Sequence, residues 1–134
     1  MPTKKQNILY SIIFLIVCIC WVSYGFFRRN DLIRNHKIGI GKITGYTCGG
    51  TGNAGTMFIN YKYVVEGKNY KASSAYTCGK FRDFEGHFLF ENFPIVYSPK
   101  SPGNSVILLT PKVYQLYNVP IPINQKWVLQ YIIN

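Results

Sequence analysis

The chain has 134 residues, which is enough for one domain and one additional element but not for two domains of ordinary size. Fifteen lysines and arginines against five aspartates and glutamates give a formal net charge of +10. This excess favours anionic surroundings such as phospholipid headgroups, nucleic acid or acidic glycans. With only two histidines and five carboxylates, the chain offers few groups for acid–base catalysis.

The first predicted element is a transmembrane helix over residues 8–27, ILYSIIFLIVCICWVSYGFF, which contains no charged residue. At 1.5 Å per residue this stretch makes a helix of about 30 Å, the thickness of a bilayer core. Tyr10 and Trp21 near its ends are typical of interfacial aromatic residues. Membrane lipid is therefore the first predicted partner. The alternative is a cleaved signal peptide, with the small residues Ser23 and Gly25 at its end.

Basic residues flank this stretch, with a short basic N-terminus at residues 1–7 and a basic juxtamembrane linker at residues 28–37. More lysines and arginines follow the span than precede it, which by the positive-inside rule favours a cytoplasmic domain. Paired cysteines and the general form of an exported signal-anchor favour the opposite side. We expect a single-pass protein of the cytoplasmic (inner) membrane with an extracytoplasmic β domain, and the cytoplasmic side is the alternative.

Residues 38–110 are expected to form the β domain. The three glycines in KIGIGKITGYT predict a bent or bulged strand, and the glycine-rich residues 48–55 predict a plain loop rather than a phosphate loop. MFINYKYVV and YKASSAYT, joined by the turn EGKN, predict a β-hairpin. PIVYS and SVILL predict two further strands. The expected fold class is mainly β, with one N-terminal transmembrane helix followed by a small antiparallel sheet or open β-barrel.

Two segments lack a strand pattern. The phenylalanine-rich CGKFRDFEGHFLFENF is interrupted by Gly86, which predicts a short helical turn or an irregular loop. In the Pro-rich tail, residues 111–134, Pro120 and Pro122 forbid a continuous helix, and WVLQYII is too short for a second span. We expect the tail to pack on the β domain as a last strand that closes the sheet. The alternative is a tail that lies along the membrane surface.

The stretch FPIVYSPKSPGNSVILL resembles a large bacterial family of unknown function. In that family, one or two membrane helices accompany a small β domain that ends in an apolar-x-Tyr-x-Pro-x-x-Pro-x-x-Ser pattern. The residues that match this pattern in order are Val96, Tyr97, Pro99, Pro102 and Ser105. GKITGY and YKYVVEGKNY are similar too, so the resemblance covers roughly residues 41–109. The single span, the phenylalanine-rich segment and the tail depart from the family, and the resemblance implies no activity.

The tetrapeptide YTCG occurs twice and places Cys48 and Cys78 at the ends of two strands expected to flank residues 57–65. Across one intervening strand their Cα atoms would lie about 9.6 Å apart, beyond the limit of about 7 Å for a disulfide. A glycine follows each cysteine, so the loops could fold over and close this gap. A structural disulfide is the favoured interpretation. Reduced structural thiols, a metal site and a catalytic or redox pair are the alternatives.

A candidate binding surface combines aromatic and basic side chains of the predicted hairpin, namely Tyr61, Tyr63, Tyr70, Tyr76, Lys62 and Lys71. Such a set on an OB-like sheet would suit single-stranded nucleic acid, whose bases stack on aromatic rings. The competing interpretation assigns the tyrosines to the core and rim and the lysines to keeping sheet edges soluble, and it is preferred. We therefore expect no nucleic-acid partner.

The carboxylates are scattered over the chain, as Asp31, Glu66, Asp83, Glu85 and Glu91, and form no recognisable acid–base pair. No catalytic, cofactor-binding or metal-binding residue is predicted. We expect a non-enzymatic module that binds another protein or an envelope component, such as an immunity or secretion accessory protein, and no small-molecule substrate. The alternative is a thiol-dependent redox enzyme or metal-binding protein that uses Cys48 and Cys78.

Overall fold

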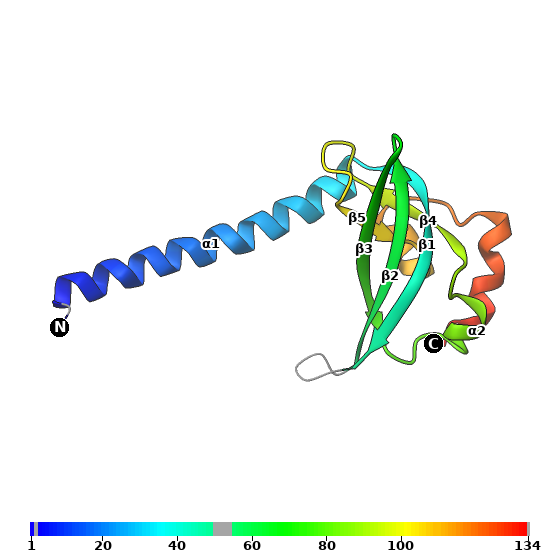
Figure 1. The fold of residues 1–134 in the computed structure, drawn as a ribbon, viewed down its shortest axis with the longest axis horizontal. Coiled ribbons are helices and arrows are strands. Elements are labelled where there is room, and N and C mark those ends of the chain that lie inside the picture. Colours follow the sequence, from blue (N-terminus) through cyan, green and yellow to red (C-terminus); the bar gives the residue numbers. More distant parts are fainter. Residues whose placement is uncertain (2, 50–54, 134) are drawn as a thin grey trace. The chain divides into compact units, whose positions relative to one another are not determined.

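The computed structural model describes residues 1, 3–49 and 55–133 (Figure 1). The chain divides into two compact units, Met1–Asp31 and Leu32–Asn134, and each is considered by itself. Most of the predicted glycine-rich loop, residues 50–54, lies outside the described residues. The elements follow one another as α1 (Lys4–Arg34), β1 (Lys37–Cys48), β2 (Thr56–Val65), β3 (Lys68–Thr77), α2 (Phe84–His87), β4 (Asn92–Tyr97), β5 (Ser105–Ile107), α3 (Pro111–Leu116) and the 3₁₀ helix η1 (Ile123–Tyr131).

Helix α1 contains the predicted transmembrane stretch and is long and apolar enough to cross a membrane. It extends to Arg34, so most of the segment expected to be a juxtamembrane linker is helical instead. This segment contains neither glycine nor proline, and nothing in it interrupts the helix. The imidazole of His36 hydrogen-bonds the carbonyl of Leu32 through Nδ1 at 3.0 Å, just beyond the end of α1.

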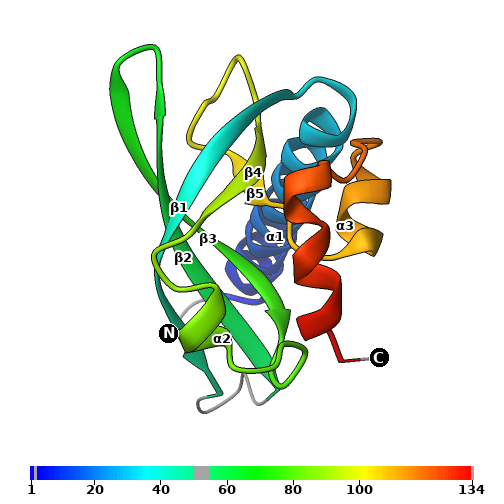
Figure 2. The same cartoon turned by 90° about the vertical axis from the view of Figure 1, so that its right-hand side faces the viewer.

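The five strands form one antiparallel sheet in the order β3-β2-β1-β4-β5. The central strand β1 pairs with β4 through its first half, from Lys37 to Lys42, and with β2 through its second half, from Gly41 to Cys48. A register shift between Ile43 and Gly45 marks a bulge in β1. The sheet curls until it is nearly closed like a barrel (Figures 1 and 2). The predicted fold class is confirmed, including the bulged first strand and the hairpin.

The inner face of the sheet forms the main core. Its fully buried members include Ile43, Ile59, Tyr61, Phe88, Phe93, Ile95 and Ile107. The short helix α2 contributes Phe84, whose ring stacks on Phe88 with 5.0 Å between the ring centroids. The phenylalanine-rich segment therefore fills one end of the barrel, with a single turn of helix at the place where Gly86 was expected to limit helix formation.

The tail does not form the expected last strand. It forms α3 and η1, and among its described residues Ile132 alone makes a β-bridge, with Phe81. Trp127 and Val128 of η1 pack against the main core, where the indole lies 5.6 Å from the ring of Phe88 between centroids. Apolar residues at helical spacing in this segment favour a helical turn over a strand. Figure 2 shows η1 (red) and α3 (orange) on the side of the domain away from the β2–β3 hairpin.

A second, smaller core covers the outer face of β4 and β5. It consists of Leu32, Val96, Leu108, Tyr114, Tyr117 and Val119. Leu32, within the last turn of α1, is 2% exposed and belongs to the same compact unit as the sheet. Within the Leu32–Asn134 unit, no described element covers the outer face of β1, β2 and β3, where Ile40 and Val64 are 69% and 61% exposed. The candidate functional site lies on this uncovered face.

Candidate functional site

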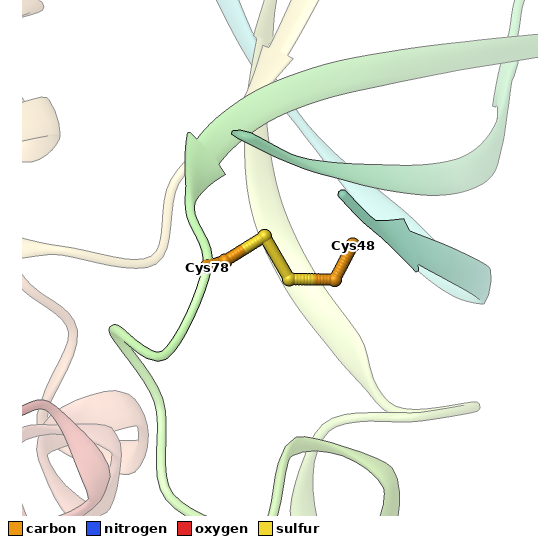
Figure 3. The surroundings of a disulfide bond; sticks show 2 residues. All are labelled: Cys48 and Cys78. Atoms are coloured by element: carbon orange, nitrogen blue, oxygen red, sulfur yellow. A yellow bond between two sulfur atoms is a disulfide. The ribbon is translucent and has the colours of Figure 1, made fainter. Parts of the chain in front are cut away.

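Cys48 and Cys78 form a disulfide with 5.8 Å between their Cα atoms (Figure 3). The predicted bridge is therefore present, and the cysteines lie closer than a simple three-strand spacing allows. The reason is that Cys48, at the end of β1, and Cys78, just after the end of β3, both lie beside the start of β2. The backbone N–H of Gly49 donates to the carbonyl of Thr56 at 3.2 Å, and that of Cys78 donates to the carbonyl of Gly55 at 2.9 Å. The two chain segments thus converge around the first residue of β2.

The imidazole of His87 contacts Asp83 and Tyr131. Its Nε2 lies 3.4 Å from Oδ2 of Asp83, and its ring stacks on Tyr131 with 4.0 Å between centroids. Within the described residues, no group of three histidine, cysteine, aspartate or glutamate side chains is placed to hold a metal ion.

The tyrosines of the predicted binding surface point into the barrel. Tyr61 and Tyr63 are 1% and 4% exposed, and Tyr70 and Tyr76 are half-buried against the same core. Tyr63 stacks between Tyr61 and Tyr70, at 5.8 and 5.6 Å between ring centroids. Lys62 is exposed on the opposite face, because consecutive side chains of a strand alternate between the two faces. The tyrosine side chains and the lysine side chains therefore point to opposite faces of the hairpin, although Tyr63 and Tyr70 also line an outer hollow together with Lys62 and Lys71.

The hydroxyl of Tyr76, on the edge strand β3, hydrogen-bonds backbone groups at the opposite edge strand β5. It donates to the carbonyl of Ile107 at 2.6 Å and accepts from the backbone N–H of Leu109 at 3.2 Å. The neighbouring Ser74 Oγ accepts from the backbone N–H of Ile107 at 3.2 Å. β3 and β5 are the two terminal strands of the sheet and share no backbone ladder among the described residues. We call the boundary between β3 and β5 the seam. At the seam, side-chain hydroxyls supply hydrogen bonds in place of strand pairing.

Two tyrosines of β2 reinforce the seam from inside the barrel. The hydroxyls of Tyr61 and Ser105 hydrogen-bond each other at 2.7 Å, and Tyr63 donates to the carbonyl of Pro102 at 2.7 Å. Burial raises the pKa of Tyr61 to about 12, although its serine hydrogen bonds oppose this shift. Burial also raises the pKa of Tyr76. These tyrosines remain protonated at neutral pH and act as hydrogen-bonding groups of the core, which suits a structural role.

The lysines form a row on the outer face. Lys42 of β1 lies opposite Lys62 of β2, and Lys62 lies opposite Lys71 of β3. Asn92 of β4 continues the row beyond Lys42. All three lysines are exposed, and none of them forms an ion pair within the described part of the chain. We refer to Lys42, Lys62 and Lys71 as the lysine row.

Exposed aliphatic side chains lie beside the lysine row. Ile40 precedes Lys42 on the same face of β1, and Val64 follows Lys62 on β2. An open hollow of about 780 Å³ is lined by Ile40, Val64, Asn92 and the lysine row, among others. We call the combination of the lysine row with Ile40 and Val64 the basic face. It brings positive charge and exposed apolar surface together on one uncovered part of the sheet.

The sequence predicted only part of the basic face. Lys62 and Lys71 were expected as binding residues, and the hairpin turn at residues 66 and 67 sets their mutual register. Lys42, Ile40 and Val64 were missed. The alternation of Val64 with the buried Tyr63 and Val65 could have identified it as outward-facing. Lys42 could not be aligned with Lys62, because the loop between β1 and β2 and the bulge in β1 leave their register open.

No protein-family model, no curated protein and no solved structure matches this chain. The resemblance to a bacterial membrane family over residues 41–109 therefore stays a prediction.

Proposed function

We propose that this protein is a single-pass, membrane-anchored module whose β domain binds another protein and catalyses no reaction. The observation that carries the proposal is the basic face, where exposed aliphatic side chains accompany lysines that form no ion pair within the described residues. No other described element of the Leu32–Asn134 unit covers this face of the sheet. Contiguous exposed apolar surface rimmed by polar residues is typical of protein interaction sites. Among the described residues, buried aromatic and aliphatic side chains pack together inside the barrel.

Helix α1 would serve as the anchor in this arrangement. Its length and apolar composition support a span, and the proposed location is the cytoplasmic (inner) membrane. The disulfide between Cys48 and Cys78 supports an extracytoplasmic β domain, since disulfides persist in oxidising compartments. The count of basic residues around the span favours the cytoplasmic side, so the two indications predict opposite orientations of the β domain. Protease access to Lys68 and the hairpin turn from each side of sealed vesicles would decide between them.

The proposed lack of catalysis is supported by the engagement of the reactive groups. The two domain cysteines are bridged, and the buried tyrosines donate hydrogen bonds within the core. Substrate turnover that is lost in Cys78→Ser or His87→Ala, with the fold retained, would contradict the proposal. A reversible thiol titration with a defined reduction potential would have the same consequence, because it would indicate a redox function.

Photo-cross-linking in native membranes tests the binding function directly. A photoreactive amino acid is placed in the full chain at one exposed position at a time. Val64 reports on the basic face, Phe90 on the connection before β4, and Leu116 on α3, and all three side chains are exposed. We expect a defined protein adduct from at least one position on the β domain. If only lipid adducts or no adducts form at any of them, the proposed protein-binding function is wrong.

A further inference from the structure

Without a bound partner, the lysine row destabilises the sheet, because its three positive charges repel one another. Like charges directly opposite each other on neighbouring strands destabilise a sheet, and here three of them follow one another across β1, β2 and β3. Lysines often protect the edges of sheets, but Lys42 and Lys62 lie on strands that are paired on both sides. Protection of an edge therefore does not explain them. An anionic group seated on the row would offset the repulsion.

The spacing of the lysine row suits a helix laid across the strands. Neighbouring strands lie about 4.8 Å apart, so the Cα atoms of Lys42 and Lys71 are separated by about 9.6 Å. On an α-helix, residues four apart are separated by about 6 Å along the axis, and residues seven apart by about 10.5 Å. Carboxylates at positions i, i+4 and i+7 of a helix can therefore lie over the three lysines in turn.

The exposed aliphatic side chains define what the rest of this helix must carry. Ile40 and Val64 occupy the row next to the lysines, so they would face the adjacent stripe of the same helix. Apolar side chains on that stripe would enter the hollow beside the lysines and bury both aliphatic groups. A helix with carboxylates on one stripe and apolar residues on the next is therefore the complementary shape.

We propose that the basic face binds an acidic, amphipathic helical segment of a partner protein, with its carboxylates on Lys42, Lys62 and Lys71 and its apolar residues on Ile40 and Val64. This inference rests on the proposed function, for which it specifies the site and the chemistry of the partner. A bilayer surface is the less suitable occupant. The outer face of a curled sheet is convex. A flat layer of lipid headgroups would therefore contact its most protruding side chains but would not fill the hollow between the side chains.

Binding of a designed peptide to the full chain in zwitterionic nanodiscs tests the inference. The probe is a fluorescent helical peptide of about 18 residues with glutamates at i, i+4 and i+7 and leucines on the adjacent stripe. A scrambled peptide of the same composition is the comparator. We expect saturable binding of the amphipathic peptide and at least about tenfold weaker binding of the scrambled one. Binding should weaken as the salt concentration rises, because charge pairs at the rim are screened.

Lys62→Glu is the decisive variant, because it reverses the charge at the centre of the row. It should reduce peptide affinity by at least about tenfold. Its matched control, Lys112→Glu, makes the same change in charge on the exposed surface of α3 and should alter affinity by less than about twofold. Lys62→Glu should fold at least as stably as the wild type, since the new carboxylate lies between Lys42 and Lys71.

Several results would overturn the inference. These are equal losses of affinity in Lys62→Glu and Lys112→Glu, equal binding of both peptides, or preferential binding to vesicles of phosphatidylglycerol over the amphipathic peptide. Photo-cross-linking distinguishes two outcomes: that the basic face is not the binding site, and that the domain binds no protein at all. Protein adducts from Leu116 or Phe90 but none from Val64 would remove the basic face as the site and leave the binding function intact. An adduct from Val64 supports the inference when its cross-linked peptide is acidic and amphipathic.

Discussion

The hydroxyl of Tyr76 donates a hydrogen bond to the backbone carbonyl of Ile107 across 2.6 Å, at the seam between β3 and β5. The same hydroxyl accepts from the N–H of Leu109, so one side chain satisfies two backbone groups that no strand ladder reaches. Because an unsatisfied backbone group in a buried position is costly, this contact bears on the stability of the whole barrel.

Tyr76→Phe should therefore destabilise the β domain by about 2 kcal/mol, since it leaves two backbone groups without partners. Urea unfolding followed by the fluorescence of Trp127 measures the change. Tyr46→Phe is the matched control, because the Tyr46 hydroxyl makes no hydrogen bond to the described residues while its ring packs edge-on against Phe84. Tyr46→Phe should cost less than about 0.5 kcal/mol. Equal costs for the two variants would show that the seam depends little on the Tyr76 hydroxyl.

Gly41→Ala tests the close packing of the central strand. A Cβ atom at Gly41 would lie 2.8 Å from Cγ2 of Ile95 and 3.3 Å from Cδ2 of Tyr61, both in the core. Such overpacking should cost about 1–3 kcal/mol in unfolding free energy. Gly45→Ala is the control, since its nearest neighbour would be Nδ2 of Asn60 at 4.0 Å. If Gly41→Ala is as stable as Gly45→Ala or more stable, the strand at Gly41 is not packed as closely as these distances indicate.

Loss of the disulfide should lower stability substantially. The bridge joins residues 30 apart in sequence, and closing a loop of this length stabilises the fold by about 3.7 kcal/mol through the entropy of the unfolded chain. The double variant Cys48→Ser, Cys78→Ser should lose roughly this amount in chemical denaturation. Cys18→Ser with Cys20→Ser is the control, because these free cysteines lie on α1. Peptide mapping of the non-reduced protein should recover the Cys48–Cys78 linkage. Its absence in native membranes would contradict an oxidised β domain.

Stability should decline at alkaline pH. Burial raises the pKa values of Tyr61 and Tyr114 to about 12 from the ordinary value of 10.0. A raised pKa means that the folded state retains a proton that the unfolded state releases. The associated stability is fully present below pH 10 and is lost as the pH rises toward 12, at about 1.4 kcal/mol per pH unit for each tyrosine.

Urea unfolding at increasing pH, combined with tyrosinate absorbance, measures this decline. Tyr61→Phe should show a shallower dependence on pH in the same window, because one of the responsible groups is absent. Constant stability across the window in the wild type would contradict the assignment of these tyrosines as buried and protonated.

Local patterns in the sequence were sufficient to predict those elements that depend only on neighbouring residues. The uncharged residues 8–27 indicate a span by length alone, and the alternation around Tyr61 and Tyr63 with the turn at Gly67 indicates the hairpin. The repeated YTCG placed both cysteines at strand ends, so their proximity followed from a three-strand meander. The prolines at positions 120 and 122 correctly excluded a continuous helix in the tail. They did not reveal that Trp127 and Val128 would pack from a 3₁₀ helix, because that choice depends on the shape of the core beneath them.

The candidate site was likewise determined partly by local sequence and partly by tertiary structure. The sequence by itself determined that Lys62 and Lys71 lie on one side of a hairpin, since the turn connects their strands directly. Only the tertiary structure decided that Lys42 completes the row, that the tyrosines face inward, and that hydroxyl groups close the seam between β3 and β5. These features depend on the register between strands joined by a long connection and on the curl of the sheet. Both are set by the packing of many side chains together, which no local stretch of sequence encodes.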